Sequence, residues 1–338
     1  MKILITGAAG FIGSNLTEAL LERGHTVVGL DNLSQGFLLN LKNVQNHRRF
    51  RFVEGDIRDE KLVLRLTRGC DVVVHLAAFK IPRYSDAMDT LLINSHGTLS
   101  VLKAAAHYGA KVVAASTSDV YGKNPKVPFS EDSDLVIGRP EVKRWSYAIS
   151  KMFEEQLLFA YHERHGLNVV ALRFFGGYGP NQHLTWWGGP QSVFINAAID
   201  DEDIPLHGDG MQTRSFTYIS DHVDGIVACI EKSEANNQVF NIGNTREITI
   251  KELALLIWGL VRGGEPKLKL TPYETFGKYE DVMRRVPDIS KARRLLNFNP
   301  KVDLEEGLKT TIRWQIGRRR ALGMPTPDLT LRFEDRAE

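Results

Sequence analysis

Cysteine is scarce in this sequence, with only Cys70 and Cys229 among 338 residues. Both lie within apolar segments, so we expect buried free thiols in a reducing compartment and not a disulfide framework. Long hydrophobic runs are absent too, because the apolar stretches have strand length, far below the about 20 residues that span a bilayer. Residues 1–6 enter a predicted strand at once and leave no room for a signal peptide. We therefore expect a cytoplasmic protein without membrane segments.

A large excess of charge is missing as well. The 43 basic and 41 acidic residues give a net charge of +2, too small for a positive field that would hold nucleic acid by its phosphates. The ten histidines show neither HxxxH nor HExxH spacing, and the two cysteines are far apart, so no metal site is expected. A nucleophile elbow is also absent.

The first half of the chain alternates short β-branched runs with amphipathic stretches. This alternation predicts a Rossmann-type α/β fold, in which crossover helices join the strands of a doubly wound parallel sheet. The expected strands are 2–6, 26–31, 51–54, 72–76, 111–116, 168–174 and, returning to the same sheet, 238–242. The expected helices are 11–23, 60–67, 89–108 and 147–165.

From residue 176 onward the sequence becomes rich in Gly, Pro and Trp. We therefore expect a Rossmann-type domain at 1–175, with a returning segment near 215–243, and a smaller substrate-binding lid at 176–214 and 244–315. Lid helices are expected at 191–200 and 250–261. The lid should cover the carboxyl edge of the sheet, where open α/β sheets bind ligands. The charged, Pro-interrupted segment 318–338 is expected to be a mostly loose tail.

A glycine-rich turn follows the first strand directly. Gly7, Gly10 and Gly13 have GxxGxxG spacing and open a helix, which is where backbone N–H groups and a helix N-terminus approach a pyrophosphate. Asp31 lies about 20 residues further on, at the end of the second strand, where a carboxylate accepts hydrogen bonds from ribose hydroxyls. The same carboxylate would repel a 2′-phosphate. The pattern predicts a bound dinucleotide, with NAD favoured over NADP.

Two further polar residues lie near this predicted site. Asp56 follows the third strand and either caps a helix or accepts a hydrogen bond from the adenine amino group, and the sequence leaves both open. Asn94 is expected to order local backbone rather than to touch a ligand on sequence alone.

Tyr147 and Lys151 are four residues apart, one turn along a helix face. A free phenol has a pKa of about 10, so a tyrosine base that works near neutrality needs a cation beside it, and Lys151 can be that cation. The hydroxyl-rich run 116–118 ends the fifth strand and faces the same edge of the sheet. Its hydroxyls can hydrogen-bond a substrate oxygen while the tyrosine removes a proton.

Together with the His-Leu-Ala-Ala run at 75–78, these motifs resemble the extended short-chain dehydrogenase/reductase superfamily over residues 1 to about 315. The resemblance implies catalytic roles for Thr117, Tyr147 and Lys151. It also implies that the glycine-rich turn, several strand ends and the catalytic pair contact NAD. These cofactor residues are Gly7, Gly10, Phe11, Ile12, Gly13, Asp31, Asn32, Asp56, Ile57, Leu76, Ala77, Ala78, Lys80, Asn94, Ser116, Tyr147, Lys151 and Phe174.

The segment 208–216 looks like the stretch whose arginine binds the diphosphate in the nucleotide-sugar branch of that superfamily, and Arg214 can do this bidentately. A UDP-sugar is the implied partner, and its implied contacts are Lys80, Ser118, Asp119, Gly176, Ser192, His207, Arg214, Asp281 and Arg285. His207 has a position that often faces uracil, but an ordinary loop histidine is equally compatible. Trp186 and Trp187 either stack on a base or sugar or pack the lid, and packing is favoured.

Three reactions share this scaffold: 4-epimerisation, 4,6-dehydration and oxidative decarboxylation of a nucleotide hexuronate. The dehydratases have a Thr-Asp-Glu triplet where this chain has Thr117, Ser118 and Asp119, so dehydration is disfavoured. UDP-glucuronate decarboxylases have Thr-Ser-Glu, and segments 144–147 and 279–287 resemble a bacterial decarboxylase domain. Asp119 is one methylene shorter, which is enough to impair a positioned carboxylate. Arg285 matches the decarboxylase arginine near the sugar, or it grips a carboxylate that is retained.

An epimerase needs no additional acid, and segment 30–36 resembles UDP-glucose 4-epimerases. A UDP-hexose or UDP-hexuronate 4-epimerase is therefore ranked first and UDP-glucuronate decarboxylation second. Gly176 and Lys278 depart from the epimerase pattern, which has Asn and Arg at these positions. A non-catalytic NAD sensor is disfavoured because the Thr, Tyr and Lys set is intact. The resemblance also implies a homodimer formed through helices 89–108 and 147–165.

Overall fold

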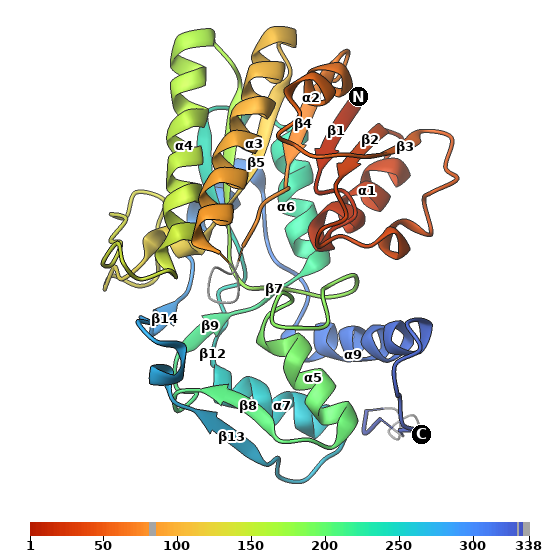
Figure 1. The fold of residues 1–338 in the computed structure, drawn as a ribbon, viewed down its shortest axis with the longest axis vertical. Helices are drawn as coiled ribbons and strands as arrows, with labels where there is room; N and C mark the ends of the chain where they lie inside the picture. Colours follow the sequence, from red (N-terminus) through yellow and green to blue (C-terminus); the bar gives the residue numbers. More distant parts are fainter. Residues whose placement is uncertain (81–85, 330, 334–338) are drawn as a thin grey trace.

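The computed structural model describes residues 1–80, 86–329 and 331–333. Within these residues a seven-stranded sheet forms the centre of the larger unit, and its neighbouring strands all run parallel in the order β11-β6-β5-β4-β1-β2-β3 (Figure 1). The strands are β1 (Lys2–Thr6), β2 (Thr26–Asp31), β3 (Phe50–Glu54), β4 (Val72–His75), β5 (Lys111–Thr117), β6 (Val169–Phe174) and β11 (Gln238–Ile242).

Helices cover both faces of this sheet, which is why its inner strands are apolar along their whole length. On one face α1 (Phe11–Glu22) packs against α6 (Ile219–Glu231). On the other face α2 (Glu60–Thr67), α3 (Ala87–Tyr108) and α4 (Trp145–His165) lie side by side. The strand order reverses between β1 and β4, which opens a ligand crevice at the carboxyl ends of doubly wound sheets. The predicted Rossmann-type fold is confirmed.

A second apolar core lies beyond the carboxyl edge of the sheet. Its helices are α5 (Pro190–Asp200), α7 (Ile250–Val261) and α9 (Leu304–Ala321), drawn below the sheet in Figure 1. Short strands complete this lid: β8 (Ile204–His207) pairs with β13 (Leu268–Thr271), β9 (Thr213–Ser215) pairs with β12 (Glu247–Thr249) and β14 (Arg284–Arg285), and β7 (Gly177–Tyr178) pairs with β10 (Thr217–Tyr218).

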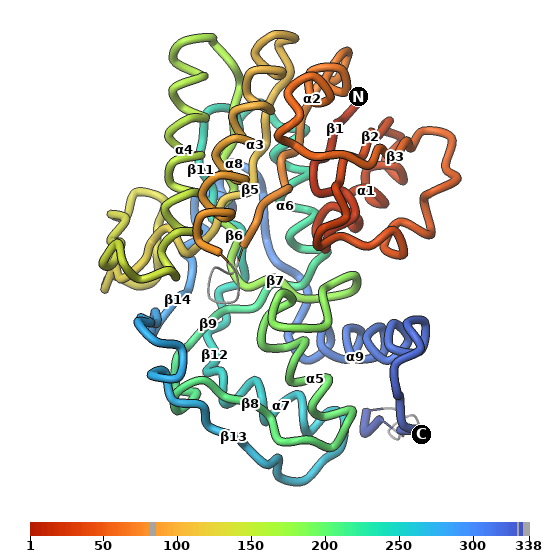
Figure 2. The backbone as a smooth tube through the Cα atoms, in the orientation of Figure 1, coloured from red at the N-terminus to blue at the C-terminus, as the bar shows by residue number. Residues whose placement is uncertain are grey.

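The chain passes between the two units more than once, as the tube in Figure 2 shows. After α5 and β8 it returns to the sheet through α6 and β11, as the sequence predicts for residues 215–243. A second return of the chain to the Rossmann unit, after β14, was not expected from the sequence. Helix α8 (Ser290–Leu296) buries Ala292 and Leu296 in the core of the Rossmann unit, although 244–315 was assigned to the lid.

The prediction that residues 318–338 form a mostly loose tail is wrong for residues 318–321. Helix α9 extends to Ala321, where the buried Arg319 pairs with Asp200 of α5 at 2.5 Å. A basic run at a helix C-terminus is stabilised by the helix dipole, so charge alone did not indicate disorder here. Further on, Leu331 is also buried, while residues 330 and 334–338 lie outside the described residues.

Two other expectations concern composition. Cys70 and Cys229 are free and buried, as predicted. Across residues 1–80, 86–329 and 331–333, none of the helices combines the length and the apolar character that crossing a bilayer requires.

Candidate active site

A large pocket lies between the sheet and the lid, with a volume of about 600 Å³. Its floor is the glycine-rich turn between β1 and α1. A Cβ on Gly13 would lie 2.9 Å from the Cα of Ala8 and would overlap the carbonyl oxygen of Gly7, so only glycine allows the turn to pack this closely. The exposed backbone of such a turn, at the start of a helix, suits a pyrophosphate.

Asp31 ends β2 beside this turn and is 8% exposed. Its carboxylate oxygens accept hydrogen bonds from the backbone N–H groups of Ala9, at 2.9 Å, and Leu33, at 2.8 Å. Burial raises the pKa of Asp31, and these backbone donors act in the opposite direction. Each carboxylate oxygen has a second acceptor position, so the residue can hold the turn and still accept a ribose hydroxyl. The glycine turn and Asp31 together fit an NAD molecule.

Asp56 does not cap a helix and does not line the pocket. Asp59 is the N-cap of α2, and its side chain accepts from the Leu62 N–H. Asp56 instead binds the Arg58 guanidinium through both oxygens at 2.8 Å, which together with a hydrogen bond from Asn32 lowers its pKa to about 2. The helix-capping role considered for Asp56 is therefore wrong, whereas its contact with the adenine amino group stays a prediction. Asp56 forms a surface ion pair and accepts from Asn32, which does line the pocket.

Asn94 orders the local backbone, as expected from the sequence. Its side chain accepts from the N–H of Phe79 at 2.7 Å and donates to the carbonyl oxygen of Phe79 at 3.1 Å. It also donates to the Ser150 hydroxyl at 2.9 Å, which ties the segment after β4 to α4. Asn94 does not line the pocket, and the cofactor contact that the resemblance implies for it stays a prediction.

The predicted catalytic residues meet at the carboxyl end of β5. Thr117 ends that strand, while Tyr147 and Lys151 lie on the first turns of α4, and all three line the pocket. The Tyr147 and Thr117 hydroxyls are hydrogen-bonded. Burial, followed by the Asp119 and Glu154 carboxylates, raises the pKa of Tyr147 above its usual value, and Arg285 acts against them. The Lys151 ammonium is paired with Glu154, a partner that the sequence reasoning missed.

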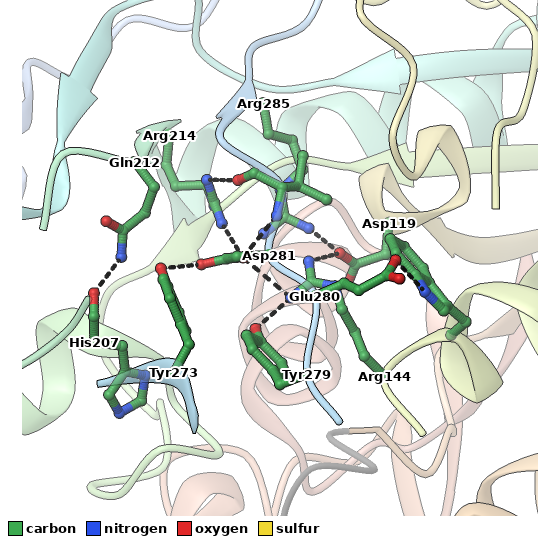
Figure 3. Close-up of polar contacts among 12 residues, drawn as sticks. Asp119, Arg144, His207, Gln212, Arg214, Tyr273, Tyr279, Glu280, Asp281 and Arg285 are labelled. Carbon is green, nitrogen blue, oxygen red and sulfur yellow. Dashed lines mark hydrogen bonds and ion pairs between the residues drawn. The ribbon is translucent and has the colours of Figure 1, made fainter. Parts of the chain in front are cut away.

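Five charged side chains alternate in sign along the pocket wall next to Tyr147 (Figure 3). Asp119 pairs with Arg285 and, at 3.4 Å, with Arg144. Arg144 also donates to Asp281 at 3.2 Å, and Asp281 accepts from Arg214 at 3.1 Å. We call this set the arginine-aspartate chain. It links the Rossmann unit, which supplies Asp119 and Arg144, to the lid, which supplies the other three.

The electrostatics of this chain keep both carboxylates ionised. Burial favours the neutral form of Asp119, but Arg285, Arg144 and Arg214 together hold the pKa of Asp119 below its usual value. Asp281 behaves in the same way, with a further hydrogen bond from Tyr273 at 2.6 Å. Burial and the nearby Arg285 lower the pKa of Arg214 to about 10. The site therefore has three guanidinium groups facing two carboxylates.

Most of the predicted substrate residues line the pocket, namely Lys80, Ser118, Asp119, Gly176, His207, Arg214, Asp281 and Arg285. Ser192 does not: it is 1% exposed, and its carbonyl oxygen accepts from Gln315 of α9 at 2.8 Å. Gly176 has a structural reason to differ from asparagine, because a Cβ there would overlap the carbonyl oxygen of Ser215. Arg144 is a pocket residue that was not assigned, although it lies only three positions before Tyr147.

Trp186 packs within the lid, as favoured, whereas Trp187 packs against the Rossmann unit. Trp186 stacks on His207 with ring centroids 4.5 Å apart and meets Phe194 edge-on at 6.4 Å. Trp187 meets Phe79 edge-on at 5.5 Å. Both tryptophans also face the pocket, so packing and ligand contact do not exclude each other.

Comparisons with known proteins agree with this geometry. The family model described as GDP-mannose 4,6 dehydratase matches residues 4–311. A UDP-N-acetyl-alpha-D-glucosaminuronate decarboxylase from Bacillus cytotoxicus is 38% identical over 93% of this chain and 97% of its own length. UDP-glucuronic acid decarboxylase 1 from Xenopus tropicalis is 37% identical over 93% of this chain and 72% of its own.

Solved structures of similar chains include enzymes that catalyse other reactions. A UDP-glucuronic acid 4-epimerase from Bacillus cereus, in complex with UDP-glucuronic acid and NAD, superposes with a TM-score of 0.85 at 30% identity, over 94% of this chain and all of its own. DesIV, a dTDP-glucose 4,6-dehydratase from Streptomyces venezuelae with NAD bound, gives a TM-score of 0.86 at 31% identity, over 95% and 98% of the two chains.

Proposed function

Because the chain belongs to the GDP-mannose 4,6-dehydratase family, within the NAD-dependent epimerases, dehydratases and decarboxylases of nucleotide sugars, we propose that it is a UDP-hexuronate decarboxylase. The proposal depends mainly on Arg285 and Arg144, which both pair with Asp119. Asp119 lies two residues after Thr117, so these two guanidinium groups are near the catalytic residues. Guanidinium groups are the natural partners of a sugar carboxylate, since their fork of donors matches its two oxygens.

The charge of the pocket supports an acidic sugar. Three arginines and two aspartates leave one net positive charge in the arginine-aspartate chain. Arg214 lies at the lid end of this chain and is assigned to the diphosphate, while Arg285 and Arg144 lie at the end nearest Tyr147 and are assigned to the C6 carboxylate. A neutral hexose would bring no second carboxylate to this pair of cations, which are held by Asp119 and, for Arg144, also by Asp281.

The chemistry assigned to the chain begins at the sugar C4 hydroxyl. Tyr147 takes its proton, and the hydrogen-bonded Thr117 hydroxyl orients the same oxygen. NAD, when bound, supplies the hydride acceptor for the carbon atom. The C6 carboxylate is then β to a carbonyl group, so carbon dioxide can leave while the electron pair of the C5–C6 bond moves toward the C4 oxygen. A proton then has to add at C5, and the hydride has to return from the reduced cofactor to C4, so that the net change is the loss of carbon dioxide. Arg285 and Arg144 hold the carboxylate until that bond breaks.

This proposal reverses the order reached from the sequence, which placed a 4-epimerase first. The most similar curated relatives named above are decarboxylases, and they cover almost the whole of this chain. The epimerase is kept as the second candidate because Asp119 is shorter than the glutamate of the decarboxylase triplet. In addition, a UDP-glucuronic acid 4-epimerase has a closely similar fold. An epimerase would use the same arginines to retain the carboxylate.

Product analysis separates the two candidates. The protein with NAD is incubated in turn with UDP-glucuronate, UDP-N-acetylglucosaminuronate and UDP-glucose, and products are separated by mass and by sugar stereochemistry. We expect a UDP-hexuronate to lose the mass of carbon dioxide and UDP-glucose to remain unchanged. An acidic product of unchanged mass with inverted C4 would establish the epimerase instead. Tyr147→Phe is the control and should bind NAD without turnover.

We also propose that the protein is a homodimer that pairs α3 and α4 with their copies. These neighbouring helices expose large apolar side chains, with Met88 60%, Phe153 51% and Leu92 43% exposed. Light scattering on the wild type and on Phe153→Asp tests this: we expect a dimer that the substitution converts to monomer.

A further inference from the structure

Lys151 has an acidic partner within its own helix. Its ammonium nitrogen lies 2.9 Å from Oε2 of Glu154, three residues further along α4, and the two side chains are 1% and 3% exposed. Ion pairs this deeply buried require each charge to be balanced, because an unpaired charge in such a place is costly. Glu154 is therefore the counter-ion of the lysine that is assigned to stabilise ionised Tyr147.

Other buried polar groups lie next to this pair. Burial raises the pKa of Glu154, while Lys151 and the Thr98 hydroxyl of α3 act to lower it, and Oε1 of Glu154 has no hydrogen-bond partner among the described residues. The Thr98 hydroxyl lies 3.0 Å from Nε2 of His75 on β4, and Nδ1 of His75 lies 2.7 Å from the Thr6 hydroxyl at the end of β1. Thr98, His75 and Thr6 thus form a row of buried polar groups between the Lys151–Glu154 pair and the strand that precedes the glycine-rich turn.

The charges around Glu154 are few and identifiable. Burial, and next the charge of Lys151, lower the pKa of His75 to about 3, so this ring is neutral near pH 7 and carries no competing charge. The neighbouring Glu155 is occupied by Arg173 of β6 at 2.7 Å. Among the described residues, the titratable or charged groups that face Glu154 and Tyr147 include Lys151 and Glu155 on α4, His75 on β4, Arg173 on β6, Asp119 after β5 and Arg285 on β14, and Thr98 faces Glu154 from α3.

We propose that Glu154 is a positioning residue that offsets the charge of Lys151 and thereby sets how readily the Tyr147 hydroxyl gives up its proton. The inference rests on the proposed role of Tyr147 as the base. Burial and the Glu154 carboxylate both act against the phenolate, since each raises the pKa of Tyr147. A lysine has three N–H donors, so one held by Glu154 leaves two for the tyrosine and for a ribose hydroxyl.

Glu154→Gln tests this proposal because it keeps the shape and removes the charge. In the NAD-saturated protein, tyrosinate absorbance near 295 nm is followed with pH, and the curve of the matching Tyr147→Phe protein is subtracted. Removing a nearby negative charge should move the Tyr147 ionisation to a pH about one unit lower, or more. The acidic limb of the pH profile for turnover should move in the same direction. Curves identical to the wild type, including no ionisation in either protein, would overturn the proposal.

Two further variants separate this effect from damage to the fold. Glu154→Met removes the charge with an apolar side chain of similar length, and it should lower the pH of ionisation like the glutamine variant. Asp221→Asn is the matched control: Asp221 is 2% exposed and accepts from the Lys301 and Val302 N–H groups, away from the pocket. It should leave the Tyr147 titration unchanged. Because the titration needs no sugar, a failure of the proposed decarboxylation would not alter its outcome.

Discussion

Replacing Arg173 by methionine should destabilise the protein far more than the same replacement at Arg246, although both arginines hold a glutamate by two hydrogen bonds. Arg173 binds Glu155 at 3.0 and 2.7 Å, with side chains 6% and 7% exposed. Arg246 binds Glu305 at 2.6 and 2.8 Å, but these side chains are 45% and 33% exposed. The two arginine–glutamate pairs thus have similar geometry and differ chiefly in burial. Each arginine has further partners, which are Tyr121 and the Glu131 carbonyl oxygen for Arg173 and Asp303 for Arg246.

The magnitudes follow from what each variant leaves behind. Without Arg173, the donor that Glu155 keeps among the described residues is the hydroxyl of Ser116, at 2.5 Å. The Tyr121 hydroxyl and the Glu131 carbonyl oxygen each lose a donor. Breaking a buried pair from one side costs about 3–5 kcal/mol, whereas an exposed pair contributes about 0–1 kcal/mol. For 338 residues, an unfolding entropy of about 0.7 kcal/mol/K converts these values into a Tm lowered by about 4–7 °C and by less than about 1.5 °C.

Differential scanning calorimetry of the two variants and the wild type measures this contrast. Glu155→Gln combined with Arg173→Met should recover part of the loss, since no unpaired charge is then buried. Equal Tm shifts for Arg173→Met and Arg246→Met would refute the reasoning, because burial would then not decide the contribution of a salt bridge in this fold.

Other predictions concern the cofactor loop, acid stability and the C-terminal helix. Gly13→Ala should weaken NAD binding in a titration by about 5- to 150-fold, the cost of about 1–3 kcal/mol for an overpacked site, while Gly259→Ala, which meets no atom within 4 Å, should not. Asp281→Asn should lower Tm at pH 7, and the difference from wild type should begin to shrink only as the pH falls below about 4 and should close as it reaches the depressed pKa of the folded protein, because the stabilising effect of this carboxyl is lost as it is protonated. Arg318→Met should lower both Tm and NAD affinity, because Arg318 donates to Asn40, whose amide holds the glycine-rich turn at 2.8 Å, and an unchanged affinity would contradict that link.

The Rossmann unit was predictable because its elements are local patterns. Strands β1, β2 and β11 and helices α2 and α7 have the boundaries expected from the sequence, since apolar runs with Gly, Asp or Thr at their ends specify both the element and its limits. Helix α9 was missed although its signals were present: Asp303 caps it, acidic residues fill its first turn and arginines its last. Those arginines were interpreted as a tail.

The short lid strands could not be found in the same way. β9 has three residues and pairs with β12 and β14, which are about 35 and 70 positions away in the chain. Strands of two or three residues are too short to show an alternation of apolar and polar side chains, so they can be identified only from the strands with which they pair. The same limit applies to the arginine-aspartate chain. The sequence named Asp119, Arg214, Asp281 and Arg285 one by one. The contact between Asp119 and Arg285 joins residues more than 160 positions apart and depends on how the lid sits on the sheet.

Those contacts also bear on the sequence argument against decarboxylation. The objection was that aspartate is one methylene shorter than the glutamate of the decarboxylase triplet. Yet Asp119 already contacts both Arg285 and Arg144, so its shorter side chain does not prevent the pairing that a longer one would make. A substrate carboxylate must compete with Asp119 for these two guanidiniums, and a neutral sugar offers them nothing in exchange. Discrimination between acidic and neutral sugars can therefore arise from this exchange of carboxylates, with the length of residue 119 setting how easily the substrate displaces it.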